Sequence, residues 1–278
     1  MAETGVIGIV IIILNFIISY KGFNDLNFFE KYKFEVDKVL INREYIRLIS
    51  SAFLHVSWTH LIFNMISLYA FCGLIERYIG EVSFLIIYIF SILGGKALVL
   101  LIHRFHGNYS SVGASGGVVG VIFASIALFP GLEIGLFGIP ASIPSWIYGL
   151  LYVLYSIYGI KSGKDNIGHE AHLGGGLVGL VIALIIKPEA INSNYIPILC
   201  VLIPCVVFIY LIITRPQILL VDNLFFKQHE NYFDVDHKYN DIRHKKQVEI
   251  DKLLDKIGKK GIESLSKKEK QKLEEYSK

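Results

Sequence analysis

Ser115 is a candidate nucleophile because of the residues around it and the apolar segment that it opens. It stands in the run Gly113-Ala114-Ser115-Gly116. Small neighbours leave the hydroxyl uncrowded, so Ser115 could attack a carbonyl carbon if a general base lay beside it. The Gly-x-Ser-x-Gly spacing also fits the nucleophile elbow of soluble hydrolases. That elbow follows a strand, whereas this serine lies in apolar helical sequence.

The alternative interpretation of this run is close helix packing. Gly116, Gly120 and Ala124 recur every four residues and form a stripe of small side chains on one helix face. Such stripes line many contacts between membrane helices. Taken by itself, the run leaves a packing role and a catalytic role open for Ser115.

A candidate base lies in the segment Gly168-His169-Glu170-Ala171-His172. His172 shares a helix face with Gly175 and Gly179, which follow three and seven residues later. Two glycine-lined faces in contact would bring Ser115 and His172 within hydrogen-bond reach, and this pair is the minimal arrangement that activates a serine hydroxyl. The apolar spans contain no obvious third carboxylate, which favours a dyad over a triad.

His60 and Asn64 could assist the same chemistry. They are four residues apart, so they share a helix face, and both side chains can donate hydrogen bonds to an oxyanion. His55 lies five residues before His60, which places it in the preceding loop. For His55, hydrogen bonding within that loop and a catalytic role are both open.

The elements that must position these residues are membrane helices. The chain has 278 residues, 53% of them hydrophobic, and a mean hydropathy of +0.52, which is too apolar for an ordinary soluble domain. Several stretches approach the roughly 20 residues that cross a bilayer. Seven spans are predicted, at residues 5–20, 60–74, 82–102, 116–130, 144–160, 171–186 and 196–214. The first is expected to be a retained helix, because no small-residue cleavage site follows it.

Three regions are predicted along the chain. They are a membrane core at 1–186 with a first loop at about 21–57, a linker and seventh span at 187–216, and a polar extramembrane tail at 217–278. In the tail, Ser266 and Glu269 have the spacing of a capping box. The tail is therefore expected to be a small helical hairpin, with Leu265 and Leu273 packed on its first helix.

Charge and composition narrow the classes of partner. The formal net charge is only +3, which predicts no nucleic-acid partner. The three cysteines lie in apolar segments and are expected to be small buried hydrophobes. Lys96 lies inside an apolar span, and its ammonium is expected to extend to the membrane interface. No cofactor is predicted, and no role is assigned to His169.

In their order and spacing, these motifs resemble those of the rhomboid family of intramembrane serine proteases, over roughly residues 40–186. The matching pieces are His55…His60…Asn64, Gly113-Ala-Ser115-Gly116 and Ala171-His172-Leu-Gly-Gly175. The resemblance implies an all-α membrane protein, with a six-helix transmembrane bundle, a seventh C-terminal span and a small helical tail. It implies Ser115 as nucleophile, His172 as general base, and an oxyanion site formed by His60, Asn64 and the Ser115 backbone N–H.

The resemblance also implies structural supports. Arg47 matches a family residue that supports the structure of the first loop, and Glu76 matches one that supports the second span. Gly175 matches the glycine that lets the two catalytic helices touch. Gly113 and Gly116 flank the nucleophile and belong with the oxyanion site.

Two positions depart from the family pattern. Val119 stands four residues after Ser115, where the family often has an aromatic ring stacked on the histidine. Ile46 stands before Arg47, where the family often has tryptophan. Neither departure removes a catalytic group, but His172 could be oriented differently.

The implied function is an intramembrane serine endopeptidase that cleaves transmembrane segments of other proteins. Its partners would be transmembrane substrates and the lipid bilayer, and its location the cell membrane; the oligomeric state is not predicted. One alternative is an inactive rhomboid-like protein that binds membrane clients without cutting them. Another is a metal or ion transporter that uses its histidines, which is disfavoured because no Asp or Glu accompanies them in mid-span.

Overall fold

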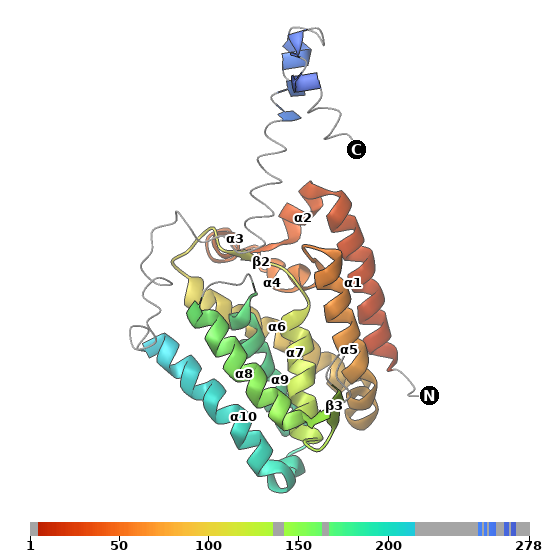
Figure 1. Ribbon diagram of the computed structural model, residues 1–278, viewed down its shortest axis with the longest axis vertical. Helices are drawn as coiled ribbons and strands as arrows, with labels where there is room; N and C mark the ends of the chain where they lie inside the picture. Colours follow the sequence, from red (N-terminus) through yellow and green to blue (C-terminus); the bar gives the residue numbers. More distant parts are fainter. Residues whose placement is uncertain are drawn as a thin grey trace. The chain divides into compact units, whose positions relative to one another are not determined.

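The computed structural model describes residues 5–135, 142–162 and 167–214, together with separate residues between 250 and 270. The chain divides into two compact units, residues 1–232 and 233–278. Figure 1 shows the first unit as a bundle of long helices with short elements at its ends. The long helices are α1 (Val6–Asn24), α5 (Trp58–Ile79), α6 (Glu81–His103), α7 (Ser115–Leu128), α8 (Ser145–Ser162), α9 (His169–Ile186) and α10 (Glu189–Thr214).

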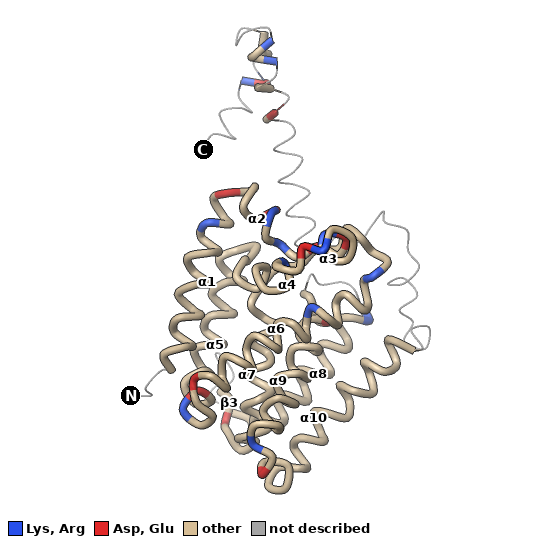
Figure 2. Tube along the Cα trace, turned by 180° about the vertical axis from the view of Figure 1, so that it is seen from behind, with Lys and Arg blue, Asp and Glu red and all other residues tan. Residues whose placement is uncertain are grey.

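The predicted all-α membrane bundle is confirmed. Within the described ranges, α1, α5, α6, α9 and α10 are long and apolar enough to cross a membrane. Of the two other predicted spans, α7 is apolar but has only 14 residues, and the 18-residue α8 includes four tyrosines and a lysine. Figure 2 shows the charged residues of this unit mainly near the two ends of the helices, with the middle of the bundle almost free of them. Such a distribution suits a protein that lies in a bilayer.

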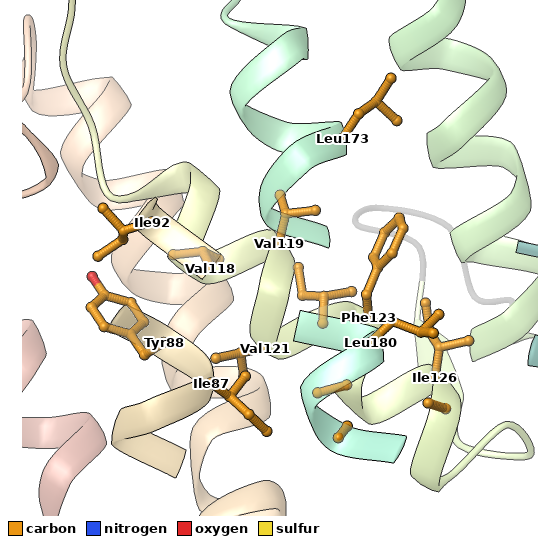
Figure 3. Packing of buried hydrophobic residues seen from close by; sticks show 14 of the residues in the cluster. Ile87, Tyr88, Ile92, Val118, Val119, Val121, Phe123, Ile126, Leu173 and Leu180 are labelled. Carbon is orange, nitrogen blue, oxygen red and sulfur yellow. The ribbon is translucent and has the colours of Figure 1, made fainter. Parts of the chain in front are cut away.

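The helix α7 occupies the centre of the bundle (Figure 1). Every residue of α7 after Ser115 is buried. In Figure 3, Val118 lies beside Ile92 and Val121 beside Ile87, both of α6, while Phe123 lies beside Leu180 of α9. A helix that is apolar all round and buried all round is expected at the core of a membrane bundle.

The predicted first loop contains several short elements. They are α2 (Leu26–Tyr32), β1 (Phe34–Glu35), α3 (Val36–Leu40), α4 (Arg47–Ser50) and the 3-10 turn η1 (Ser51–Phe53). The strand β1 pairs in antiparallel fashion with β2 (Ser110–Ser111), which lies just before the Gly113–Gly116 run. A second small hairpin pairs β3 (Glu133–Gly135) with β4 (Ser142–Pro144). The first loop is therefore tied to the segment that leads into α7.

Lys96 corrects the sequence-based expectation. Its side chain is buried, with 4% exposed, and its Nζ donates to the Ser111 hydroxyl at 2.8 Å. The Phe34 ring lies 4.7 Å from the same ammonium. The prediction that Lys96 reaches the interface is wrong, because β1 and β2 bring a hydroxyl and an aromatic face to this cation inside the protein.

The helix α10 starts earlier than its predicted span and contains one non-helical residue, Asn194. The Asn194 side-chain Nδ2 donates to the backbone oxygen of Ala127 at 3.0 Å. That carbonyl belongs to the last turn of α7, where helix geometry leaves oxygens without an intrahelical partner. The break in α10 thus caps the end of α7.

The tail unit confirms the predicted capping box. The Ser266 backbone N–H donates to Glu269 Oε2 at 2.7 Å, and the Glu269 N–H donates to Ser266 Oγ at 3.3 Å. Lys256 Nζ lies 2.8 Å from Glu269 Oε1, and these contacts lower the pKa of Glu269 to about 2. Leu265 is buried as expected, whereas Leu273 lies outside the described residues.

Candidate active site

Ser115 is the first residue of α7. The first intrahelical bond runs from Val118 N–H to the Ala114 oxygen at 3.0 Å, so the backbone N–H groups of the first turn point out of the helix end. This end of a helix also has the positive partial charge of the macrodipole. Ser115 is partly exposed, although the rest of α7 is buried. Its hydroxyl is therefore accessible beside free amide donors.

Gly113 fixes the turn before Ser115. Its φ is +125°, a conformation that favours glycine. A Cβ at this position would lie 2.8 Å from His60 Cε1 and 3.8 Å from Ser115 Oγ. The imidazole of His60 therefore packs against the Gly113 backbone, close to the Ser115 hydroxyl.

Asn64 lies one turn after His60 on α5, as the spacing predicts. Its side chain is buried, with 8% exposed, and Nδ2 donates to the His60 backbone oxygen at 3.0 Å. A side-chain amide has two N–H donors, so this bond leaves Asn64 with a second donor. His60 and Asn64 thus share a face beside the start of α7.

His55 bridges three parts of the bundle. Its Nδ1 lies 2.8 Å from Ser19 Oγ on α1, and its Nε2 accepts from the Ala114 backbone N–H at 3.4 Å. The Ser19 hydroxyl donates in turn to the Phe53 oxygen at 2.8 Å. These bonds fit one neutral tautomer, with the proton on Nδ1. His55 also packs edge-on against His60, with ring centroids 4.8 Å apart. It therefore supports both the His60 ring and the Ala114 backbone next to Ser115.

The predicted contact between glycine faces is present between α7 and α9. A Cβ on Gly175 would collide with the Gly116 backbone oxygen and would lie 3.0 Å from Gly116 Cα. A Cβ on Gly179 would collide in the same way with Gly120. The glycines of α9 thus permit this backbone contact, which brings the start of α7 next to the helix of His172.

The His172 side chain has a hydrogen-bond partner that sequence analysis missed. Tyr152 Oη on α8 lies 2.8 Å from His172 Nδ1. Within the described part of the chain, no hydrogen bond joins Ser115 to His172. The signal in the sequence is faint, because Tyr148, Tyr152 and Tyr155 share a helix spacing that is equally typical of tyrosines at a membrane interface.

The other polar residues at the start of α9 contact side chains of α6 and α8. Glu170 is buried and its Oε1 lies 3.5 Å from His103 Nε2 at the end of α6. The His169 ring packs edge-on against Tyr155, with centroids 5.1 Å apart. Among the described residues, no group of three or more His, Cys, Asp or Glu side chains could hold a metal ion.

Arg47 and Glu76 each tie together two parts of the fold. The buried Arg47 donates through Nη1 to the backbone oxygens of Glu30 and Lys33, at 2.8 and 2.7 Å. Its Nε bonds Glu44 at 2.6 Å, which lowers the pKa of that exposed carboxyl. On α5, Glu76 accepts from the backbone N–H groups of Ile7 and Gly8, at 2.9 and 3.0 Å. Glu76 therefore caps the start of α1, where a negative charge is favoured.

Comparison with known proteins gives the family. Residues 42–189, just over half of the chain, match the Rhomboid domain family. The chain belongs to the rhomboid family, which includes serine proteases, and it is a multi-pass integral membrane protein. Residues 233–278 match a second family, described as a family of unknown function (DUF6576).

Individual relatives share about three residues in ten with this chain. RHOMBOID-like protein 12, mitochondrial, from Arabidopsis thaliana is 30% identical over 192 residues, 63% of this chain and 56% of the relative. Rhomboid protein 1, mitochondrial, from Saccharomyces cerevisiae is 30% identical over 150 residues, 51% of this chain and 43% of the relative. Putative rhomboid protease YdcA from Bacillus subtilis is 34% identical over 96 residues, 34% of this chain and 47% of the relative. The chain thus spans about half the length of these relatives.

Proposed function

We propose that the chain is an intramembrane serine endopeptidase that cleaves transmembrane segments of other membrane proteins. Ser115 is the nucleophile and His172 the general base. The observation that supports this most strongly is the glycine contact between Gly116 and Gly175. It packs the helix that begins with the serine against the helix of the histidine, inside a rhomboid domain.

The proposed reaction is an acyl transfer. His172 accepts the proton from Ser115 Oγ as this oxygen bonds to the substrate carbonyl carbon, and the peptide C–N bond then breaks as the amine leaves with a proton. Water hydrolyses the resulting ester. The oxyanion formed in each step lies at the start of α7, where the Ser115 backbone N–H, His60 and Asn64 supply donors.

The proposal includes a local adjustment at the dyad. Ser115 and His172, both described, are not hydrogen-bonded in the structure, and catalytic hydrogen bonds often tighten only when substrate binds. The same observation is what favours the second candidate function, an inactive rhomboid-like protein that binds membrane clients. The two candidates differ in whether Ser115 reacts.

The membrane fold supports the proposed substrate class, a transmembrane segment of another protein. A peptide bond within a membrane helix is shielded by its own helical hydrogen bonds, so a substrate must unwind before its carbonyl reaches Ser115. Glycine or proline near the cut lowers that cost, by about 1 kcal/mol for glycine and about 3 kcal/mol for proline. We propose the cell membrane as the location, on the five described helices that are long and apolar enough to cross a bilayer. Two of the similar proteins are mitochondrial by name.

The test is labelling by a fluorophosphonate probe, with the modified residue located by mass spectrometry. A protease labels at Ser115, and both Ser115→Ala and His172→Ala abolish the label. The matched control is Ser125→Ala, since Ser125 is a buried serine of the same helix whose hydroxyl donates to the Val121 backbone oxygen at 3.0 Å. Folded wild-type protein that does not label would favour the client-binding candidate.

A further inference from the structure

Tyr152 on α8 contacts the base of the proposed dyad directly. Its Oη lies 2.8 Å from His172 Nδ1. The two ring centroids are 6.1 Å apart, with the planes inclined by 36°. Both side chains are partly buried, so water competes less for this hydrogen bond than it would at the surface.

The Tyr152 ring is itself held by neighbours. Phe123 of α7 packs edge-on against it, with centroids 6.1 Å apart. Tyr148, one turn earlier on α8, stacks on it with the same centroid separation of 6.1 Å. Phe123 in turn packs on α9, since a Cβ at Gly176 would lie 2.8 Å from the Phe123 ring. The Tyr152 ring is thus held by side chains of α7 and α8, which limits the positions that its hydroxyl can take.

The chemistry of imidazole gives this hydroxyl a role. A neutral histidine has one donor nitrogen and one acceptor nitrogen, and the partner of one nitrogen determines the state of the other. If His172 Nδ1–H donates to the Tyr152 oxygen, Nε2 has its lone pair free for the Ser115 proton. After the transfer both nitrogens are donors, and the Tyr152 oxygen still accepts from Nδ1.

Among the residues that the structure describes, no carboxylate is hydrogen-bonded to His172 Nδ1. Glu170, two residues before His172, pairs with His103 instead. Val119, one turn after Ser115, has neither a ring nor a polar group to offer the imidazole.

We propose that Tyr152 is the positioning residue of His172. Its phenol forms a hydrogen bond with His172 Nδ1 and so holds the imidazole in the orientation and tautomer in which Nε2 faces Ser115. This inference rests on the proposed protease function. It gives the dyad a third, uncharged member supplied by a different helix. It also makes the orientation of the base depend on the position of α8.

The test compares Tyr152→Phe with wild type in the full chain, reconstituted in lipid with a single-span substrate. The substitution retains the ring and its packing and removes only the hydroxyl. The matched control is Tyr158→Phe, which removes a hydroxyl from the same helix. Tyr158 is 64% exposed. The kcat of Tyr152→Phe is expected to fall about tenfold, equivalent to about 1.4 kcal/mol. Its KM should stay within about twofold of wild type, because Tyr152 bonds the base and not the substrate.

A second readout separates positioning from general packing. In protein with 15N-labelled histidine, assigned with His172→Ala, Tyr152→Phe should shift the His172 Nδ1 resonance, and Tyr158→Phe should leave it in place. The inference is overturned if Tyr152→Phe keeps the wild-type kcat, or if the resonance does not move. If wild type neither cleaves nor labels at Ser115, the proposed function itself fails. If wild type is active and Tyr152→Phe is equally active, only the proposed role of Tyr152 is rejected and the proposed function stands.

Discussion

At the scale of single residues, Gly113 is under two constraints at once. Its φ of +125° favours glycine, and the His60 ring occupies the space where a Cβ would stand, at 2.8 Å. Since the next turn begins the helix with Ser115, a change here moves both the imidazole and the backbone donors. The geometry at Ser115 therefore depends on a residue that has no side chain.

We predict that Gly113→Ala lowers the cleavage rate at least tenfold and the free energy of unfolding by about 1–3 kcal/mol, the usual cost of a strained backbone conformation. Cleavage and thermal unfolding in detergent would be measured together. Gly131→Ala is the control, because a Cβ at Gly131 meets nothing within 4 Å. Equal activity and stability of the two variants would show that His60 does not depend on the Gly113 turn.

Some of these residue contacts could be predicted from the sequence, and others could not. The glycines of α9 were predictable, because spacings of three and seven residues define a helix face whatever the fold. Tyr152 was not, because its partner His172 lies 20 residues away and the contact depends on how α8 is rotated. Lys96 was predicted wrongly for the same reason: Ser111 and Phe34 reach it only after the short strands pair.

At the scale of elements, the contact between α7 and α9 sets the distance between the proposed nucleophile and base. We predict that Gly175→Ala costs about 1–3 kcal/mol of stability through overpacking and removes most of the cleavage activity, because α9 must move away from Gly116. The control is Gly168→Ala at the start of α9, since its Cβ would have only an ordinary contact of 4.0 Å with Ala171. Wild-type cleavage by Gly175→Ala would contradict this account of the packing.

The cap on α1 is a separate element-scale feature. Glu76 accepts two backbone N–H groups with its two oxygens, and glutamine has only one acceptor oxygen. Glu76→Gln is therefore predicted to lower the free energy of unfolding by about 1–3 kcal/mol, because it leaves a buried donor unsatisfied. Thermal unfolding would be compared with Glu81→Gln, which changes an exposed carboxylate at the start of α6. If both variants unfold at the same temperature, Glu76 has no special role at the start of α1.

At the scale of the whole molecule, the chain consists of two compact units that match two different families. All proposed site residues lie in residues 1–232. The abrupt change from apolar to polar composition was visible in the sequence and marks the tail as a separate region. The function of the tail was not visible, because a capping box and an ion pair stabilise a helical turn without indicating a ligand.

We predict that a chain ending at residue 232 keeps its fluorophosphonate labelling and its cleavage rate within about twofold of the full chain. The physical reason is that a compact unit with its own core retains its fold when a separate unit is removed. Labelling and thermal unfolding would be measured on both chains in the same lipid. A shortened chain that unfolds as the full chain does but no longer cleaves would show that the tail takes part in catalysis.

The central claim is that Ser115 cuts a peptide bond within the membrane. The most direct measurement is cleavage of a single-span substrate in proteoliposomes by wild type and by Ser115→Ala, with the unfolding temperature of both proteins recorded. The account predicts a product from wild type, cut within or next to the apolar span, and none from Ser115→Ala of equal stability. Equal cleavage by both proteins, or cleavage by neither across substrates whose spans contain glycine and proline, would contradict it.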